Sequence, residues 1–198
     1  GHMDIPAYAI PGASIQVRSF VLFNLLKLEL DAFRLDDVAH ALGNLCRFGG
    51  HTARFYSVAQ HAVYTSILVP DYLKLAALHH DDTEAYMVDV PRPLKALLPE
   101  YKPMEQNIAG FIATELGLPV DAFDHPDIKA ADNKMLVLEA YALMSNRELV
   151  QQWAGVPDMT ILSVDPRFEP WSPAEARDRF LYRHTQLVTK LNEGAYDA

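Results

Sequence analysis

The sequence contains a single cysteine, Cys46, among 198 residues. One thiol cannot form an internal disulfide, which is typical of proteins in a reducing compartment. No run of about 18 apolar residues is present, so a membrane span is not expected. A secretory signal has a basic segment followed by an apolar one, and the beginning of the chain has no such pattern. These absences predict a cytoplasmic protein with no membrane partner.

Basic charge is also in short supply. The chain carries 17 Lys and Arg against 26 Asp and Glu, a formal net charge of -9. A protein that binds duplex nucleic acid through its phosphates usually has a basic surface, so no nucleic acid polymer is expected as a partner. A phosphorylated small molecule is still compatible with this charge if a metal ion and a few local cations receive it.

The remaining composition is that of an ordinary globular protein, with 50% hydrophobic and 22% charged residues. A chain of this length can bury one substantial core. We take Gly1-His2-Met3 as a cloning remnant and predict that residues 4–198 form a single domain.

Hydrophobic spacing and capping signals predict an all-α, compact globular helical bundle. The apolar segment before Leu30 has no helical spacing and suggests a short strand or β hairpin. The motifs Ser57-Val58-Ala59-Gln60 and Ser172-Pro173-Ala174-Glu175 are capping boxes that each open a helix. Six helices are expected: from Asp36 to the pair Gly49-Gly50, and over residues 57–69, 72–88, 104–116, 128–149 and 172–191.

The run His79-His80-Asp81-Asp82-Thr83-Glu84 carries the strongest chemical signal. It lies within an apolar stretch that we predict to be helical, and burying an isolated charge there is costly unless the charge is paired or binds a metal. In a helix, Glu84 would share a face with His80 and Asp81. The alternative is a solvated acidic turn beside a satisfied core histidine, and the His80-Asp81 pair alone does not decide between them.

Two further residues favour a metal site. His61 is expected in the first turns of the helix opened at Ser57, and Asp132 in another helix among small and apolar residues. An aspartate is a poor helix former and an unusual core residue unless something ionic faces it. Imidazole and carboxylate ligands together suit one divalent transition ion: Mn, Fe, Co, Ni or Zn.

Three strings now indicate a family resemblance: DDVAHALGNLCRFGGHTARFYSVAQHA, LHHDDTEAYMVDVPRPLK and IKAADNKMLVLEA. They resemble the HD-domain phosphohydrolase superfamily, in particular its compact deoxynucleotide phosphohydrolases, such as 5'-deoxynucleotidases and phage dATP triphosphohydrolases. The resemblance implies a helical bundle of the HD-domain type, often assembled as a homo-oligomer (dimer or hexamer). It also implies four metal ligands: His61, His80, Asp81 and Asp132.

The chain departs from the family pattern after the His-Asp pair, where Asp82 replaces a small residue. We expect Asp82 to face solvent or to support the metal ligands from behind. His79 is expected to pack rather than to bind the ion. His40, His125 and His184 carry no functional signal.

Catalytic roles are implied for Glu84 and Asp89. Hydrolysis at phosphorus needs one group to orient a water and another to protonate the leaving oxygen. Asp89 follows the predicted helix in a proline-rich turn, where it could instead serve only as a cap or an ion-pair partner.

Substrate contacts are implied for Arg47, Phe48, Lys95 and Lys129. The three cations match positions that face the nucleotide phosphates in the family, where additional Mg²⁺ is also conceivable. Arginine can hold a phosphate in bidentate fashion. Phe48 matches an aromatic that packs on the sugar, although a core position is an equal alternative.

The expected function is therefore metal-dependent hydrolysis of phosphate from deoxynucleotides, with a dNTP such as dATP as a plausible substrate. A 5'-deoxynucleotidase acting on dNMP alone is the first alternative. A nucleotide-sensing module without catalysis is a second alternative, although such modules usually lack one of the metal-binding residues, and all four are present here. A cyclic-nucleotide phosphodiesterase is a third, and it would need a second metal for which His125 is the only spare histidine.

Overall fold

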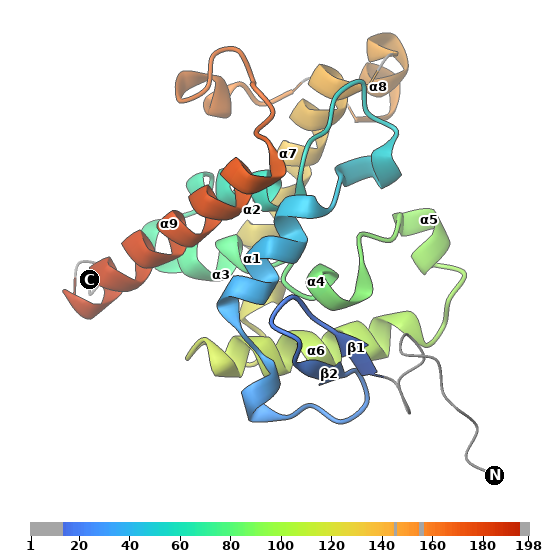
Figure 1. Ribbon diagram of the computed structural model, residues 1–198. Helices are drawn as coiled ribbons and strands as arrows, with labels where there is room; N and C mark the ends of the chain where they lie inside the picture. The colour runs from blue at the N-terminus through green and yellow to red at the C-terminus, as the bar shows by residue number, and fades with distance from the viewer. Residues whose placement is uncertain (1–13, 145, 155–156, 195–198) are drawn as a thin grey trace.

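Helices dominate residues 14–144, 146–154 and 157–194, which are the residues described in the computed structural model (Figure 1). The predicted cloning remnant, residues 1–3, lies outside this part. The strands are β1 (Ser14–Gln16) and β2 (Leu22–Asn24). The helices are α1 (Leu35–Asn44), α2 (Val58–Ile67), α3 (Lys74–Leu78), α4 (Glu84–Met87), α5 (Arg92–Lys95), α6 (Tyr101–Glu115), α7 (Pro126–Leu143), α8 (Arg147–Ala154) and α9 (Pro173–Asn192). The predicted all-α class with an N-terminal hairpin is confirmed.

The hairpin explains the apolar segment near the N-terminus. β1 and β2 pair antiparallel, with Ile15 opposite Phe23. Phe23 is fully buried and stacks on Tyr86 of α4 with ring centroids 3.6 Å apart. The hairpin therefore covers the helix that follows the His-Asp run.

The core forms where α9 packs against α1, α2 and α3, and where α2 packs against α7. In Figure 1, α9 runs as one long helix beside α1 and α2. The crossing of α1 and α9 is close at Gly43, where an added Cβ would lie 2.8 Å from the Pro173 carbonyl oxygen. A side chain at this position would force the two helices apart.

Both predicted capping serines act as N-caps. Ser57 Oγ accepts a hydrogen bond from the Gln60 amide at 3.0 Å, and Ser172 Oγ accepts one from the Glu175 amide at 3.2 Å. The Gln60 side chain does not return to the cap. It donates to the Glu169 carbonyl and accepts from the Trp171 amide, so it ties α2 to the segment before α9.

The predicted single helix over 72–88 is wrong. The chain forms a 3-10 turn at Asp71–Leu73, then α3, and then an irregular turn before α4 begins at Glu84. The run from His79 to Asp82 occupies that turn. Its side chains point to two opposite sides of the chain.

Three other predicted helices have different boundaries in the structure. The first helix ends at Asn44, after which Cys46 forms a β-bridge with Ser57 and the Arg47 amide donates to the Tyr56 carbonyl at 2.8 Å. These bonds pull the chain away from the helix axis. The helix expected over 128–149 is divided into α7 and α8, and the one expected over 104–116 begins earlier, at Tyr101. None of the helices described is long and apolar enough to cross a membrane.

Candidate metal centre

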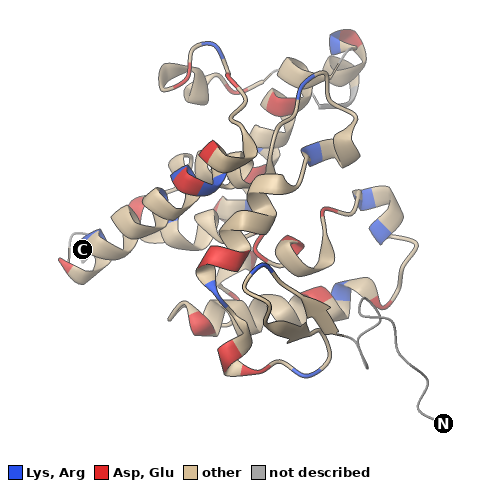
Figure 2. Ribbon diagram, in the orientation of Figure 1, with Lys and Arg blue, Asp and Glu red and all other residues tan. Residues whose placement is uncertain are grey.

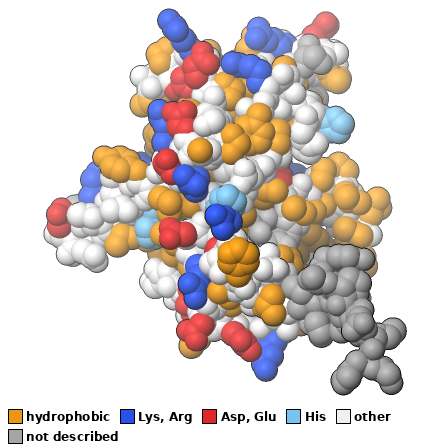
Figure 3. Space-filling view, viewed as in Figure 1, with side chains coloured by type: hydrophobic (Ala, Val, Ile, Leu, Met, Phe, Trp, Pro, Cys, Tyr) orange, Lys and Arg blue, Asp and Glu red, His pale blue; other side chains and the backbone are white. Residues whose placement is uncertain are grey.

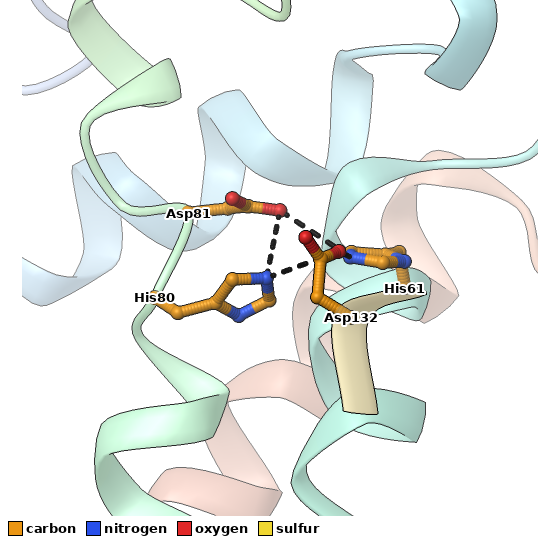
Figure 4. A group of neighbouring side chains, drawn as sticks. All are labelled: His61, His80, Asp81 and Asp132. Carbon is orange, nitrogen blue, oxygen red and sulfur yellow. Dashed lines mark ion pairs between the residues drawn. The ribbon is translucent and has the colours of Figure 1, made fainter. Parts of the chain in front are cut away.

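Three segments that are distant in sequence bring four side chains together. His61 comes from α2, His80 and Asp81 from the turn after α3, and Asp132 from α7 (Figure 4). One ligand atom from each residue lies within 4.8 Å of all the others. The predicted grouping of these four residues is therefore present.

The distances between the donor atoms fit a common ion. His61 Nε2 is 2.9 Å from Asp132 Oδ1 and 3.4 Å from Asp81 Oδ2. His80 Nε2 is 3.2 Å from Asp81 Oδ2 and 3.6 Å from Asp132 Oδ1. Donors bound at about 2.1 Å from one ion are themselves separated by roughly 3.0–3.4 Å. Small movements would suffice to place all four around a metal.

The His61 ring is oriented by a carboxylate on its other side. His61 Nδ1 is 2.8 Å from Glu139 Oε2, and both side chains are completely buried. The second Glu139 oxygen accepts a hydrogen bond from Arg47 at 2.9 Å. A carboxylate in this position holds the proton on Nδ1 and leaves Nε2 to bind a metal.

The His80 ring is oriented in the same way by the backbone. Its Nδ1 lies 2.6 Å from the Ala77 carbonyl oxygen, which can only accept a hydrogen bond. His80 Nε2 is buried and has no hydrogen-bond partner of normal geometry among the residues that the structure describes. Buried polar atoms rarely remain unsatisfied, and a metal ion among these donors would satisfy this one. The residues therefore fit a divalent transition ion.

The protonation of these groups in the metal-free protein is unusual. Burial and the Arg47 charge act to lower the pKa of His61. The charge of Glu139, together with hydrogen bonds to Asp132 and Glu139, outweighs both effects, and the pKa of His61 is raised to about 9. Burial alone would raise the pKa of Asp132, but hydrogen bonds and charges from His61 and His80 hold it well below its usual range. A bound cation would face Asp132, one of the carboxylates that raise the pKa of His61.

A cleft of about 520 Å³ opens beside this cluster. Arg47, Asp81 and Asp132 are among its lining residues, and Phe48, Glu84, Asp89, Arg92 and Lys95 complete its polar and aromatic wall. A second hollow of about 210 Å³ is lined by Lys95, Lys129, Asp81 and Asp132, among others. The two spaces share the edge formed by Asp81, Lys95 and Asp132.

The predicted substrate residues all line one of these spaces. Arg47 is buried, and the charge of Glu139 raises its pKa although burial opposes it. Phe48 is half-buried at the cleft wall, under the Arg47 guanidinium at 5.4 Å, rather than in the core. Lys95 forms an ion pair of 3.3 Å with Glu105, and Lys129 is exposed.

The predicted catalytic residues also reach the cleft, by different routes. Burial and the charges of Asp81 and Asp89 raise the pKa of Glu84 well above its usual range. Asp89 follows Val88, whose φ of 58° is strained for a β-branched residue. Phe48, with φ of 57°, is a second strained residue at this cleft. Such strain is retained mainly where function requires the conformation.

Of the two alternatives for Asp82, exposure to solvent is wrong, and support of the metal ligands from behind stays a prediction. Asp82 and His79 are both completely buried, and Asp82 Oδ2 lies 2.6 Å from His79 Nδ1. His79 packs and does not point at the ion, as predicted. Its Nε2 contacts the half-buried His184 at Nδ1 over 2.8 Å, although the sequence context of His184 gave no sign of this contact.

Glu139 and Arg92 were missed by the sequence interpretation. Glu139 lies seven residues after Asp132 on α7, and this spacing places both on one helical face. That periodicity could have identified it. The Arg92 side chain is exposed, and its Nη2 lies 3.6 Å from Asp132 Oδ2. The sequence Pro91-Arg92-Pro93 has no periodicity that could have identified this contact.

On the face shown in Figure 3, acidic, basic and hydrophobic side chains of the described residues alternate without a broad region of one sign. Figure 2 shows basic positions on α5, the segment that contributes Arg92 and Lys95 to the cleft. Arg92 and Lys95 therefore bring positive charge to the cleft beside the candidate metal centre.

No family model matches the chain. It is 41% identical over 162 residues to the Escherichia coli (strain K12) protein that carries the name "Uncharacterized protein YfdR", covering 81% of this chain and 88% of YfdR. It is 30% identical over 172 residues to "Uncharacterized protein RCAP_rcc00048" of Rhodobacter capsulatus, covering 80% of this chain and 87% of that protein. The chain belongs to the family that includes YfdR and RCAP_rcc00048.

Proposed function

We propose that the chain is a metal-dependent phosphohydrolase of the HD-domain superfamily that removes phosphate from deoxynucleotides. The observation that carries this proposal is the convergence of His61, His80, Asp81 and Asp132 at the edge of a cleft whose wall also contains cationic side chains. The donors suit a divalent ion, and the cations suit a phosphorylated substrate.

The metal would be Mn, Fe, Co, Ni or Zn, held by the four residues named above. Such an ion, when bound, acidifies a water molecule and polarises a phosphoryl oxygen. The protein contributes oriented ligands: Glu139 fixes the His61 ring and the Ala77 carbonyl fixes the His80 ring.

Glu84 and Asp89 would handle the protons of the reaction. Both line the cleft together with the ligand Asp81. Burial and the charges of Asp81 and Asp89 raise the pKa of Glu84, and a raised pKa suits a group that donates a proton to the leaving oxygen. Asp89 would then orient the attacking water.

Arg47 would bind a phosphate as a fixed charge. Its ion pair with Glu139 holds the guanidinium in place, so this cation is preorganised at the cleft wall before a substrate binds. Phe48 beside it would contact the sugar, and the exposed Arg92 would add a second cation near Asp132.

The second hollow favours a nucleoside triphosphate over a monophosphate. It meets the cleft at Asp81, Lys95 and Asp132 and adds Lys129 beyond them. A nucleoside in the larger cleft could thus extend further phosphates, with additional Mg²⁺, toward Lys95 and Lys129. A 5'-deoxynucleotidase would leave this hollow without a role.

A product-resolved screen tests the proposal. Deoxy- and ribonucleotide mono-, di- and triphosphates are incubated with the protein and Mn²⁺, Co²⁺, Ni²⁺ or Mg²⁺. We expect inorganic triphosphate or stepwise phosphate release from dATP, and a higher KM for dATP in Lys129→Ala. Phosphate from dAMP alone would identify the 5'-deoxynucleotidase instead.

Two further outcomes would contradict the proposal. Binding of dATP by the metal-loaded protein without turnover in any metal would identify a nucleotide sensor. Hydrolysis restricted to cyclic nucleotides, with about two metal ions per chain, would identify a phosphodiesterase.

A further inference from the structure

The turn that carries His80 and Asp81 is anchored on its opposite side. His80 and Asp81 point to the metal centre, whereas the flanking side chains of His79 and Asp82 are completely buried away from it. His79 Nδ1 lies 2.6 Å from Asp82 Oδ2, and His79 Nε2 lies 2.8 Å from His184 Nδ1 on α9. The turn is thus linked to the C-terminal helix.

The backbone of this turn does not fix its own shape. Regular helical bonding stops after α3, and the His80 amide reaches the Ala77 carbonyl only at 3.4 Å. Short-range bonds follow, from the Asp82 amide to the His79 carbonyl at 3.1 Å and from the Glu84 amide to the Asp81 carbonyl at 2.9 Å. Side-chain contacts must therefore supply the remaining restraint.

The helix that carries His184 is packed into the core. The His79 ring lies edge-on to Phe180 and to His184, with centroids 5.3 Å and 5.0 Å apart. Phe180 is completely buried, and α9 packs against α1, α2 and α3. His184 can therefore act as a fixed point for the His79 ring.

The arrangement depends on His184 because the buried Asp82 has little other support. Asp82 Oδ1 is buried and has no hydrogen-bond partner within the described part of the chain, so Asp82 Oδ2 and the His79 ring carry the interaction. A buried carboxylate without its partner is strongly unfavourable. Loss of the bond to His184 would let the His79 ring turn, and Asp82 would then move toward water with the adjoining ligand Asp81.

We propose that Asp82, His79 and His184 form a clamp that holds the His80-Asp81 turn in its metal-binding geometry, with His184 as a positioning residue on α9. The proposal rests on the proposed metal site and extends it, since it makes metal affinity depend on a helix that contributes no ligand. It predicts that changes on α9 at His184 reach the metal centre through His79.

The test compares three variants with the wild type. Each metal-free protein is titrated with Mn²⁺ in a calorimeter, at a temperature at which all four proteins are folded. His184→Ala should bind Mn²⁺ about 10-fold more weakly, as expected when support behind a ligand is lost. His184→Asn should recover most of the affinity, because its Oδ1 can accept a hydrogen bond where His184 Nδ1 lies. Val188→Ala removes packing one turn further along α9 and should bind Mn²⁺ as the wild type does.

The outcomes separate the clamp from the function itself. Equal Mn²⁺ affinity in wild type and His184→Ala would overturn the clamp and leave the metal site intact. Equal losses in His184→Ala, His184→Asn and Val188→Ala would also overturn it, since the effect would then be general destabilisation. A wild-type protein that binds no divalent ion would overturn the proposed function.

Discussion

Two buried histidine–carboxylate pairs lie close to the same turn and serve different ends. His61 with Glu139 and His79 with Asp82 are all completely buried, at 2.8 Å and 2.6 Å. His61 has a second ring nitrogen aimed at Asp81 and Asp132, beside an open cleft. His79 uses its second nitrogen on His184.

The comparison shows what distinguishes a metal ligand from a structural histidine. Burial and a carboxylate partner are common to both pairs, so neither identifies a site. A ring nitrogen that faces several further donors does. On this criterion His61 and His80 are candidate metal ligands and His79 is a candidate support, although the three look alike in the sequence.

The largest effect is expected from removing a ligand. His61→Ala and Asp81→Ala should each lose bound metal and phosphohydrolase turnover, because the ion loses a quarter of its protein donors and one orienting contact. Elemental analysis after loading with Mn²⁺, together with a phosphate-release assay, measures both effects. His40→Ala serves as the histidine control, and retained activity in Asp81→Ala would refute the site assignment.

A smaller effect is expected from Glu139→Gln. The amide keeps the size of the side chain but cannot accept hydrogen bonds on both arms, so it cannot satisfy His61 Nδ1 and Arg47 together. Loss of such support typically lowers metal affinity by about 10–100-fold. Titration with Mn²⁺ measures the change.

The control for this variant is Glu169→Gln, since Glu169 forms an exposed ion pair of 3.6 Å with Arg54. Its metal affinity should match that of the wild type, because exposed ion pairs contribute little. If Glu139→Gln also binds Mn²⁺ as tightly as the wild type, His61 is oriented without its carboxylate. The contrast between the two histidine pairs would then lose its basis.

Much of the fold and of the metal centre could be predicted from the sequence. Capping serines are local signals, and Ser57 and Ser172 open helices where expected. The N-terminal hairpin followed from an apolar segment without helical spacing. The grouping of His61, His80, Asp81 and Asp132 as candidate metal ligands followed from costly charges in apolar surroundings and from a family resemblance.

The rest depended on contacts between distant segments. Nothing near His184 indicates that its ring meets His79, because 105 positions separate them. The turn at residues 79–82 could not be distinguished from a helix, since its shape is set by partners on α7 and α9. The roles of Glu84, Asp89, Lys95 and Lys129 in catalysis or substrate binding stay predictions.

The smallest effect concerns the second pair and appears in the pH dependence of stability. Burial and the charge of His79 lower the pKa of His184 to about 4, against an ordinary value of 6.5. Between these two values the unfolded chain binds a proton at this ring and the folded chain does not. The stabilisation is therefore complete above about pH 6.5 and is lost as the pH falls toward 4.

His184→Asn removes this ring and should flatten that part of the profile. Denaturant unfolding of the metal-free proteins at about pH 7 and about pH 5 should show a steeper loss in the wild type. We expect a difference on the order of 1 kcal/mol, a value reduced for the half-exposed ring. Parallel losses in both proteins would mean that His184 titrates normally. In that case His79 does not place positive charge against His184. The pair of His79 and Asp82 would then not be held by the contact between the His79 and His184 rings.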